Sequence, residues 1–370
     1  MPSSKISVMI VDDSSTARRI LSDIINRHPQ MEVVAAVADP YEAVPELKKR
    51  SPNVMVLDVQ MPRMDGITFL KKLMTIQPLP VVMCSSFTEK GSSISLQCLE
   101  NGAVDIIAKP KVATKRDMQE LETRIHDTIH SAAVARFRSI SASGLGKARS
   151  QEIARPVEAS AKLSADEVLP PPNPTSVANI PTTQKIIALG ASTGGTNAIR
   201  DFLEPLPKDC PGIVMVQHMP EHFTESFANR LNEAVAIEVR QAKTGDEVRP
   251  GLALLAPGSH HLVIKRSGIR YTVEVVEGPL VSRHRPSVDV LFRSTARAAG
   301  KNAVGVILTG MGDDGATGML EMKQCGGYNF AQDKDTCVVF GMPNEAIKKG
   351  GVDQTLPLPK MPMAVLNRAK

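Results

Sequence analysis

The sequence predicts an α/β protein with two domains, and three observations lead to this prediction. The chain has 370 residues, which is enough for two domains that each bury a core of their own. Apolar runs of strand length alternate with helical patterns in both halves of the chain. Between the halves, residues 129–182 are rich in proline, alanine and serine, which indicates a flexible linker. We therefore expect one domain over residues 4–128 and a second over residues 183–370.

The first domain shows five apolar runs of strand length. The expected strands are residues 6–11, 33–37, 54–57, 81–84 and 105–107. Helical patterns lie between them, for instance at residues 15–27 and 41–49. Five strands with short connections indicate a flavodoxin-like parallel sheet. In such a sheet the functional site lies beyond the carboxyl ends of the strands.

Polar residues follow the ends of these strands. Asp12 and Asp13 follow the first strand, Asp58 the third, Ser85 the fourth and Lys109 the fifth. Three carboxylates crowded together would repel one another unless a hard cation such as Mg²⁺ lay among them. With the metal and a lysine ammonium nearby, Asp58 could attack a phosphoryl group and hold it as an acyl phosphate. Each residue alone is more often a turn or cap residue, but five in register indicate a phosphorylation site.

Residues 4–128 resemble the receiver domain of bacterial response regulators. The run Leu-Asp-Val-Gln-Met-Pro-Arg-Met-Asp-Gly at residues 57–66 matches the loop that contains the phosphorylated aspartate of that family. The resemblance implies that Asp58 accepts phosphate from a histidine kinase. It also implies that Asp12 and Asp13, together with Asp58, hold Mg²⁺.

The same resemblance gives roles to the two other residues at strand ends. Lys109 would contact the phosphate through its ammonium group. Ser85 would be the switch hydroxyl that donates a hydrogen bond to the phosphoryl oxygens. We therefore expect a domain whose state is set by phosphorylation of Asp58.

The second domain shows a similar alternation of strands and helices. The expected strands are residues 185–189, 212–217, 252–256, 261–265, 271–275, 304–308 and 328–331. This pattern predicts a doubly wound, mostly parallel α/β domain. Its chemistry should again lie in the loops at the strand ends.

The first of these strands ends in a turn that suits a catalytic serine. Residues 190–194 read Gly-Ala-Ser-Thr-Gly and fit the pattern G-x-S-x-G, in which a sharp strand-to-helix turn exposes the serine hydroxyl at a helix N-terminus. Ser192 could instead be a helix N-cap, and a glycine-rich turn could bind phosphate. A dinucleotide-binding turn needs G-x-G-x-x-G and an acidic residue after the next strand, where this chain has His218. This difference favours acyl transfer over nucleotide binding.

Three strand-end loops supply a serine, a histidine and an aspartate. A serine hydroxyl needs an imidazole within hydrogen-bond reach, and the imidazole needs a carboxylate to hold its tautomer. Ser192 and His218 follow strands expected to be neighbours, and the loop at residues 309–315 carries both Asp313 and Asp314. Spacing alone does not separate these two aspartates. The other histidines of this domain are expected to be solvated or structural, and they are His222, His260, His261 and His284.

Four segments of the second domain look like the catalytic domain of the CheB methylesterase family. They are residues 190–195, 217–220, 283–292 and 309–315. The resemblance implies that Ser192 is the nucleophile, His218 the general base and Asp314 the acid that orients it. Backbone N–H groups would form the oxyanion hole, that of Met311 by the resemblance and that of Thr193 by the geometry of the turn. The order serine, histidine, aspartate differs from that of α/β-hydrolases, so we do not expect their fold.

The resemblance extends over nearly the whole chain, because receiver, linker and catalytic domain follow one another in that family. It implies hydrolysis of glutamate γ-methyl esters on methyl-accepting chemoreceptors with release of methanol, and deamidation of receptor glutamines with release of ammonia. It also implies that the unphosphorylated receiver covers the active site and that phosphorylation at Asp58 loosens it. The partners would be the receptors and a chemotaxis histidine kinase, and the catalytic domain would need no cofactor. The alternative is a response regulator whose second domain hydrolyses a different acyl or amide substrate.

Composition narrows the other classes of function. The formal net charge of +5 forms no basic block, and no helix-turn-helix pattern is seen, so nucleic acid is not expected as a partner. The five cysteines are odd in number and widely spaced, which predicts reduced thiols rather than disulfides or a zinc site. The sequence has neither an apolar signal segment nor a run of membrane-spanning length. We expect a cytoplasmic monomer that does not insert into a membrane.

Overall fold

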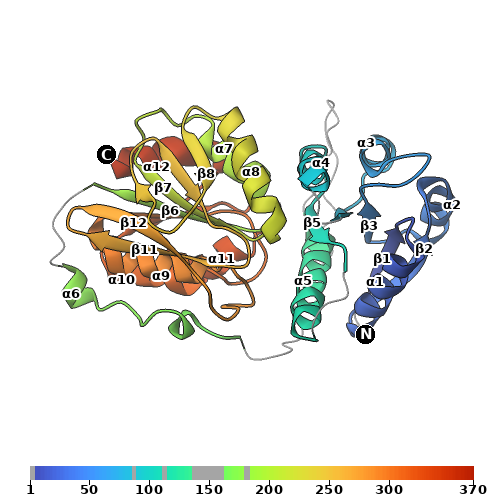
Figure 1. Cartoon of the computed structure of the whole chain (residues 1–370), viewed down its shortest axis with the longest axis horizontal. Helices are drawn as coiled ribbons and strands as arrows, with labels where there is room; N and C mark the ends of the chain where they lie inside the picture. The colour runs from blue at the N-terminus through green and yellow to red at the C-terminus, as the bar shows by residue number, and fades with distance from the viewer. Residues whose placement is uncertain (1–4, 86–88, 111–114, 136–161, 179–183) are drawn as a thin grey trace. The chain divides into compact units, whose positions relative to one another are not determined.

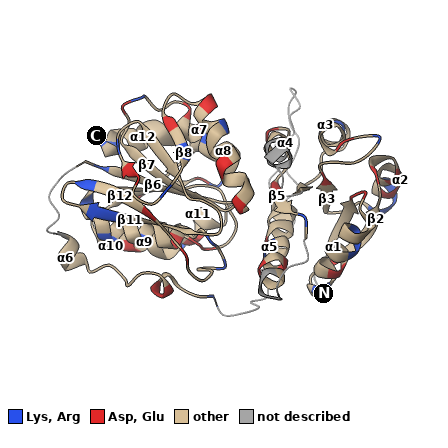
Figure 2. Cartoon of the chain, in the orientation of Figure 1, with Lys and Arg blue, Asp and Glu red and all other residues tan. Residues whose placement is uncertain are grey.

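The computed structural model of the chain describes residues 5–85, 89–110, 115–135, 162–178 and 184–370. The chain divides into two compact units, residues 1–157 and 158–370 (Figure 1). Within the described part, no helix is both long and apolar enough to cross a membrane. Acidic and basic residues are interspersed along the elements of both units (Figure 2).

The first unit is a five-stranded parallel sheet covered by helices. The sheet order is β2-β1-β3-β4-β5, as expected for a flavodoxin-like domain. The strands are β1 (Ile6–Val11), β2 (Met31–Val37), β3 (Val54–Asp58), β4 (Val81–Ser85) and β5 (Asp105–Ala108). The helices are α1 (Ser15–Arg27), α2 (Pro40–Arg50), α3 (Gly66–Ile76), α4 (Glu89–Glu100) and α5 (Lys115–Val134). All five predicted strands are present, and both predicted helices agree to within one residue at each end.

Helices α1 and α5 form one covering layer of this sheet. Leu21, Ile24 and Ile25 of α1 are buried together with Ile125 and Ile129 of α5 and with apolar residues of the strands. The spacing of three and four residues along α1 places these side chains on a single helix face. Helix α5 continues to Val134, into the range predicted as linker. Apolar packing therefore stabilises the body of the sheet, and the polar residues lie at the ends of the strands.

The second unit contains a seven-stranded sheet in the order β15-β14-β13-β6-β7-β10-β8, and all neighbours are parallel. These strands are β6 (Ile186–Ala191), β7 (Gly212–Gln217), β8 (Glu238–Gln241), β10 (Leu252–Leu255), β13 (Ala303–Ile307), β14 (Tyr328–Gln332) and β15 (Gln354–Leu356). A separate antiparallel sheet contains β9 (Glu247–Val248), β11 (His261–Ser267) and β12 (Arg270–Val276). The chain winds outward in both directions from the middle of the parallel sheet. The crevice expected at such a switch point lies at the carboxyl ends of β6 and β13.

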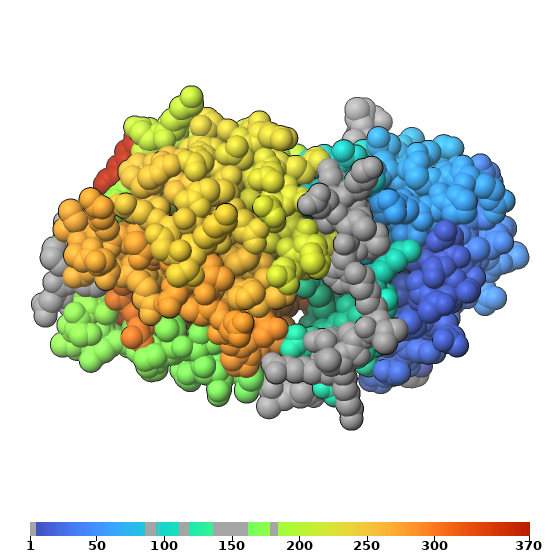
Figure 3. All heavy atoms as spheres, in the orientation of Figure 1, coloured from blue at the N-terminus to red at the C-terminus, as the bar shows by residue number. Residues whose placement is uncertain are grey.

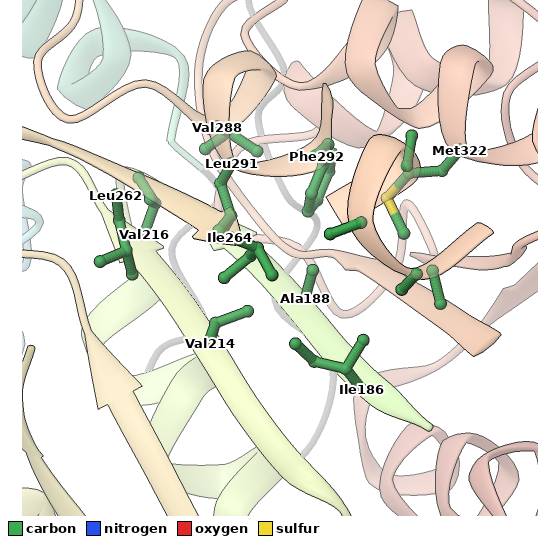
Figure 4. Close-up of a cluster of buried hydrophobic side chains, with 14 of the residues drawn as sticks. Ile186, Ala188, Val214, Val216, Leu262, Ile264, Val288, Leu291, Phe292 and Met322 are labelled. Carbon is green, nitrogen blue, oxygen red and sulfur yellow. The ribbon is translucent and has the colours of Figure 1, made fainter. Parts of the chain in front are cut away.

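Helices cover both faces of this sheet (Figure 1). One layer contains α7 (Gly195–Leu203), α8 (Glu221–Ala234) and α12 (Met361–Ala369), and the other contains α9 (Val288–Ala299), α10 (Ala316–Gln324) and α11 (Met342–Lys348). Val288, Leu291 and Phe292 of α9 are fully buried against β6, β7 and β11 (Figure 4). The first turn of α9 is thereby held close to the end of β6.

All seven strands predicted for this domain are present, and three further strands were not predicted. The additional strands β8, β9 and β15 are short and lie at sheet edges. Their sequences alternate weakly or are polar, because an edge strand buries little of its surface.

Residues 162–178, which we call the strap, lie within the range predicted as linker and pack along the surface of the second unit (Figure 3). The strap contains a short 3₁₀ turn, Ala165–Glu167, and the helix α6, Pro174–Ala178. The guanidinium of buried Arg293 donates hydrogen bonds to Asp166 Oδ1 at 2.5 Å and to the Leu169 carbonyl at 2.9 Å. These contacts join the strap to α9.

Candidate functional site

The three loops predicted to carry the catalytic residues lie side by side. Strand β6 has β7 and β13 as its neighbours, so their carboxyl ends meet at one edge of the sheet. The loops are also bonded to one another through the main chain. The N–H of Ser192 donates to the Thr309 carbonyl at 3.0 Å, and the N–H of His218 donates to the Ala191 carbonyl at 3.1 Å. The structure thus brings together residues that are far apart in the sequence.

Two glycines allow this close approach. A Cβ atom on Gly190 would lie 2.2 Å from Cγ1 of Val288, the first residue of α9. A Cβ atom on Gly310 would lie 2.7 Å from the Cβ of Ser192. Side chains at these two positions would push α9 and the loop after β13 away from the serine.

Ser192 lies before helix α7 and is buried, with 8% of its surface exposed, whereas the sequence predicted an exposed hydroxyl at the helix start. Helix α7 begins at Gly195 and is capped by Gly194, which has a left-handed φ of 76°. No side chain accepts a hydrogen bond as the cap of α7, so Ser192 is not the N-cap. Its carbonyl instead accepts the Gly195 N–H at 2.7 Å. The neighbouring loops bury the serine. The sequence of the turn alone does not predict their position.

His218 and Asp314 form a buried hydrogen-bonded pair. The Nε2 atom of His218 lies 2.8 Å from Oδ2 of Asp314. An ionised carboxylate only accepts hydrogen bonds, so Nε2 carries the proton of the neutral imidazole. The other ring nitrogen, Nδ1, is buried and has no hydrogen-bond partner among the described residues. Nδ1 is therefore the nitrogen that holds a free lone pair.

The N-terminus of α9 compensates the charge of Asp314. Oδ2 of Asp314 accepts a hydrogen bond from the Val288 N–H at 2.8 Å. Oδ1 of Asp314 accepts one from the Asp289 N–H at 2.9 Å and one from the Ser287 hydroxyl at 2.8 Å. Burial alone would raise the pKa of Asp314, but the hydrogen bond from His218 and the backbone hydrogen bond from Asp289 oppose it, and the net direction is downward. The positive end of the helix dipole favours the ionised form as well. Asp314 is thus held as a carboxylate.

The adjacent Asp313 is placed differently. Its side chain is 46% exposed, and its Oδ1 lies 2.8 Å from Nζ of Lys162 in the strap. It does not contact the histidine in the way that Asp314 does. The structure therefore separates two aspartates that spacing left equivalent.

Two histidines set aside at the sequence level lie next to this pair. The ring of His284 stacks on the ring of His218, with centroids 3.7 Å apart and planes 13° apart. His261 is fully buried, and its Nδ1 accepts the Ser287 N–H at 3.2 Å. His261 is structural, as expected, but His284 directly contacts the candidate base. The motif at residues 283–292 was noted for its resemblance, yet nothing in its spacing shows that it folds back onto His218.

The two backbone amides predicted to form an oxyanion hole belong to loops that are firmly held. The carbonyl of Thr193 accepts the hydroxyl of Thr309 at 3.0 Å. Met311 follows Gly310, whose carbonyl accepts the N–H groups of Gly341 at 3.0 Å and Met342 at 2.8 Å. The contribution of the Thr193 and Met311 amides to catalysis stays a prediction.

The first unit gathers its polar residues at the ends of β1, β3, β4 and β5. Carboxylate oxygens of Asp12, Asp13 and Asp58 all lie within 4.8 Å of one another. The ammonium of Lys109 donates to Asp58 Oδ2 at 2.7 Å, and its backbone N–H donates to the Ser85 carbonyl at 2.8 Å. All five residues predicted for this site are thus brought to one edge of the sheet.

The charge of this acidic site is poorly compensated. Burial raises the pKa of Asp58 to about 6, the hydrogen bond from Lys109 opposes this shift, and the charge of Asp12 adds to it. The buried Oδ2 of Asp12 lies 3.0 Å from the Lys109 ammonium but accepts no hydrogen bond of ordinary geometry from the described residues. A set of carboxylate oxygens with an unsatisfied member suits a hard cation such as Mg²⁺.

Comparisons with known proteins cover both units. Residues 187–365 match the family described as CheB methylesterase, and residues 8–122 match the response regulator receiver domain. A protein-glutamate methylesterase/protein-glutamine glutaminase of Geobacter metallireducens is 55% identical over 98% of each chain. One of Rhizobium johnstonii is 52% identical over 98% of each chain. The solved catalytic domain of the Thermotoga maritima CheB methylesterase is 38% identical, covers 50% of this chain and 99% of its own, and has a TM-score of 0.48.

Proposed function

Because the chain belongs to the CheB methylesterase family and carries a receiver domain, we propose that it is a protein-glutamate methylesterase and protein-glutamine glutaminase of chemotaxis. It hydrolyses glutamate γ-methyl esters on methyl-accepting chemoreceptors and deamidates receptor glutamines. The observation that supports this most is the buried His218–Asp314 pair beside the turn of Ser192, at the ends of three adjacent strands. A nucleophile, a base and an orienting acid in this arrangement are those of a serine hydrolase.

In the first half of the reaction, Ser192 Oγ attacks the ester carbonyl carbon and its proton passes to Nδ1 of His218. Backbone N–H groups of Thr193 and Met311 would stabilise the oxyanion of the tetrahedral intermediate. His218 then returns the proton to the leaving methoxide, which departs as methanol and leaves an acyl-enzyme. In deamidation the same proton goes to the leaving nitrogen, which departs as ammonia. In the second half, His218 takes a proton from a water molecule, whose oxygen attacks the acyl carbon, and returns the proton to Ser192 Oγ as the free glutamate leaves.

Asp314 acts on this reaction through His218. Its carboxylate holds the proton on Nε2, so that Nδ1 is free to accept the proton of the serine. It also stabilises the imidazolium that forms when that proton arrives. Since its pKa lies below the ordinary value, Asp314 is ionised throughout the neutral range.

The receiver would control this activity through Asp58, whose carboxylate attacks the phosphoryl group supplied by a histidine kinase. Asp12, Asp13 and Asp58 would hold Mg²⁺, which when bound neutralises negative charge on the carboxylates and the phosphoryl group. Lys109 would contact the phosphate, and Ser85 would donate a hydrogen bond to it. Phosphorylation then relieves a restraint that the receiver imposes on the catalytic unit.

The oligomeric state and the location of the protein complete the proposal. We infer a monomer that works in the cytoplasm, where the histidine kinase and the methylated receptor segments meet it. The catalytic unit needs no metal or cofactor in this scheme, since its own residues supply the nucleophile, the base and the charge compensation.

Methanol release from a methylated chemoreceptor fragment tests the proposal. With phosphodonor and Mg²⁺ present, the wild type should release methanol, and Ser192→Ala should lower kcat by about 10⁴- to 10⁶-fold, because only binding and the oxyanion hole remain. Ser294→Ala, which removes another buried serine hydroxyl of this unit, is the matched control and should stay within about twofold. A Ser192→Ala variant with a tenth of wild-type activity would remove this serine from the mechanism. No release by the wild type would favour a different acyl or amide substrate.

A further inference from the structure

Gln217, the last residue of β7, makes two hydrogen bonds that link the nucleophile to the base. Its side-chain Nε2 donates to the carbonyl of Ser192 at 2.9 Å and to the carbonyl of His218 at 3.1 Å. The side chain is buried, with 2% of the residue exposed. One amide group therefore bridges the main chain of the two residues between which the proton moves.

The chemistry of the amide fixes its orientation. Backbone carbonyls only accept hydrogen bonds, so the NH₂ end must face both of them. The opposite oxygen, Oε1, is buried and has no hydrogen-bond partner among the described residues. Leaving a buried acceptor unsatisfied is energetically unfavourable. This cost is tolerated here in a place where both donors are used on catalytic residues.

The local backbone is shaped around this side chain. In the β6–β7 pairing Gln217 lies opposite Ala191, the residue before the serine. A Cβ atom on Gly195 would lie 2.1 Å from Gln217 Oε1, so a glycine at this position leaves room for the amide. The Ser192 carbonyl also accepts the Gly195 N–H at 2.7 Å. The Ser192 carbonyl is thus held by two donors, the side-chain amide of Gln217 and the N–H of Gly195.

We propose that Gln217 is a positioning residue that fixes the turn of Ser192 relative to the main chain of His218, and that catalysis depends on both of its N–H donors. The proposal rests on the proposed function, because it assumes proton transfer between these two residues. A displacement of about 1 Å between reacting groups can lower a rate by about 100-fold. The hydrogen bonds of Gln217 go to the main-chain carbonyls of Ser192 and His218 rather than to the reacting oxygen or the imidazole ring, so its proposed effect is on geometry.

Gln217→Glu in the full chain keeps the shape of the side chain and removes both donors. The ionised carboxylate of this variant would place an oxygen against two carbonyl oxygens, which repels the turn. We expect kcat for methanol release to fall by about 10- to 100-fold with KM little changed. Amide hydrogen exchange over residues 192–195 should become faster, because the turn loses one of its anchors.

Asn329 offers a matched control in the same unit. Its Nδ2 donates to the carbonyls of Met319 and Gly351, both at 2.7 Å, and its Oδ1 is likewise buried without a partner among the described residues. It lies near the start of β14, at the end of the strand away from the catalytic loops. Asn329→Asp thus loses two side-chain-to-carbonyl hydrogen bonds of the same kind, and we expect a comparable loss of stability. It should keep kcat within about twofold of the wild type.

The pH dependence of Gln217→Glu separates positioning from a general loss of stability. Burial and two facing carbonyls raise the pKa of a carboxyl group at this position. Below that pKa the protonated carboxyl has one O–H donor and restores one of the two bonds. The ratio of kcat for the variant to kcat for the wild type should therefore rise as the pH is lowered, and the use of a ratio cancels any change in rate that the two proteins share.

The outcomes are distinct. A lower kcat with faster exchange in Gln217→Glu, and neither effect in Asn329→Asp, supports the proposal. A kcat within twofold of the wild type in Gln217→Glu, or equal losses in both variants, overturns it. If the wild type itself releases no methanol, the proposed function fails, and hydrogen exchange alone decides: unchanged exchange over residues 192–195 overturns the role of Gln217, and faster exchange sustains it.

Discussion

Each unit places a buried carboxylate at the carboxyl end of a parallel strand or in the loop that follows. The pKa values of these two carboxylates are shifted in opposite directions. Asp58 in the receiver and Asp314 in the catalytic unit are each 1% exposed. Burial raises the pKa of Asp58 to about 6, with Lys109 opposing the shift. The pKa of Asp314 lies below its ordinary value, because His218 and the N-terminus of α9 donate to its oxygens.

The two sites therefore differ in whether the carboxylate charge is compensated within the chain. That of Asp314 is compensated, and that of Asp58 leaves room for a cation or a phosphoryl group. Asp314 has four hydrogen-bond donors from its own chain, so its orientation does not depend on any addition. Asp58 lies beside Asp12 and Asp13, and among the described residues Lys109 is the cation that pairs with the carboxylates of Asp12 and Asp58. A cation or a phosphoryl group therefore changes the receiver site strongly. We infer that the uncompensated charge at Asp58 suits a regulated site, and that the compensated charge at Asp314 suits the proposed catalytic site.

The largest expected effect comes from removing the charge of Asp314. All four partners of Asp314 donate hydrogen bonds, so the NH₂ of an asparagine would face donors in either orientation. Asp314→Asn should lower kcat by about 10⁴-fold, since the correct tautomer of His218 and the stabilised imidazolium are both lost. Methanol release at saturating substrate measures this change.

Asp313→Asn is the control for this variant. The two aspartates are neighbours, but Asp313 is half exposed and pairs with Lys162. A surface pair of this kind contributes little, so kcat should stay within about threefold of the wild type. Equal losses in the two variants would mean that the compensated carboxylate has no special part in catalysis.

A smaller effect is expected on cation binding by the receiver. Mg²⁺ competes with protons for the carboxylates. Because the pKa of Asp58 is about 6, this group is ionised at pH 7.5 and mostly protonated at pH 5. Lowering the pH through this range should weaken Mg²⁺ binding by about tenfold. Titration calorimetry of the full chain at the two pH values measures the change.

Two variants sharpen this test. Asp58→Asn should bind Mg²⁺ weakly and lose most of the pH dependence. Asp65→Asn removes a carboxylate that caps α3 outside the acidic site, and it should keep the wild-type behaviour. Affinity that is equal at pH 5 and pH 7.5 in the wild type would contradict the raised pKa of Asp58.

Much of the fold could be predicted from the sequence, because the buried strands are continuous apolar runs bounded by glycine or charged residues. The runs that became β6, β7 and β13 were located to within two residues, and these strands position the candidate triad. Edge strands β8 and β15 were missed, since they bury little and carry polar side chains. Apolar periodicity reports burial, so it is weakest at the edge of a sheet.

From the residues alone, the candidate site could be predicted best where a residue lies at the end of a strand, whereas Asp314 was separated from Asp313 only by the family resemblance. Ser192, His218 and Asp58 meet this condition, and strand pairing then brings the right loops together. Ser287 and His284 lie in a long segment before α9, whose path depends on packing of Val288 against Gly190. The bridging role of Gln217 likewise depends on a side-chain direction that no spacing encodes.

We propose that phosphorylation of Asp58 in the receiver controls the rate at the proposed catalytic site, whose own residues need no added ligand. The most direct test is the initial rate of methanol release by the full chain, with and without a small phosphodonor and Mg²⁺, in the wild type and in Asp58→Asn. We predict that the phosphodonor accelerates the wild type and has no effect on Asp58→Asn. Equal acceleration of both proteins, or acceleration of neither, would contradict control through Asp58.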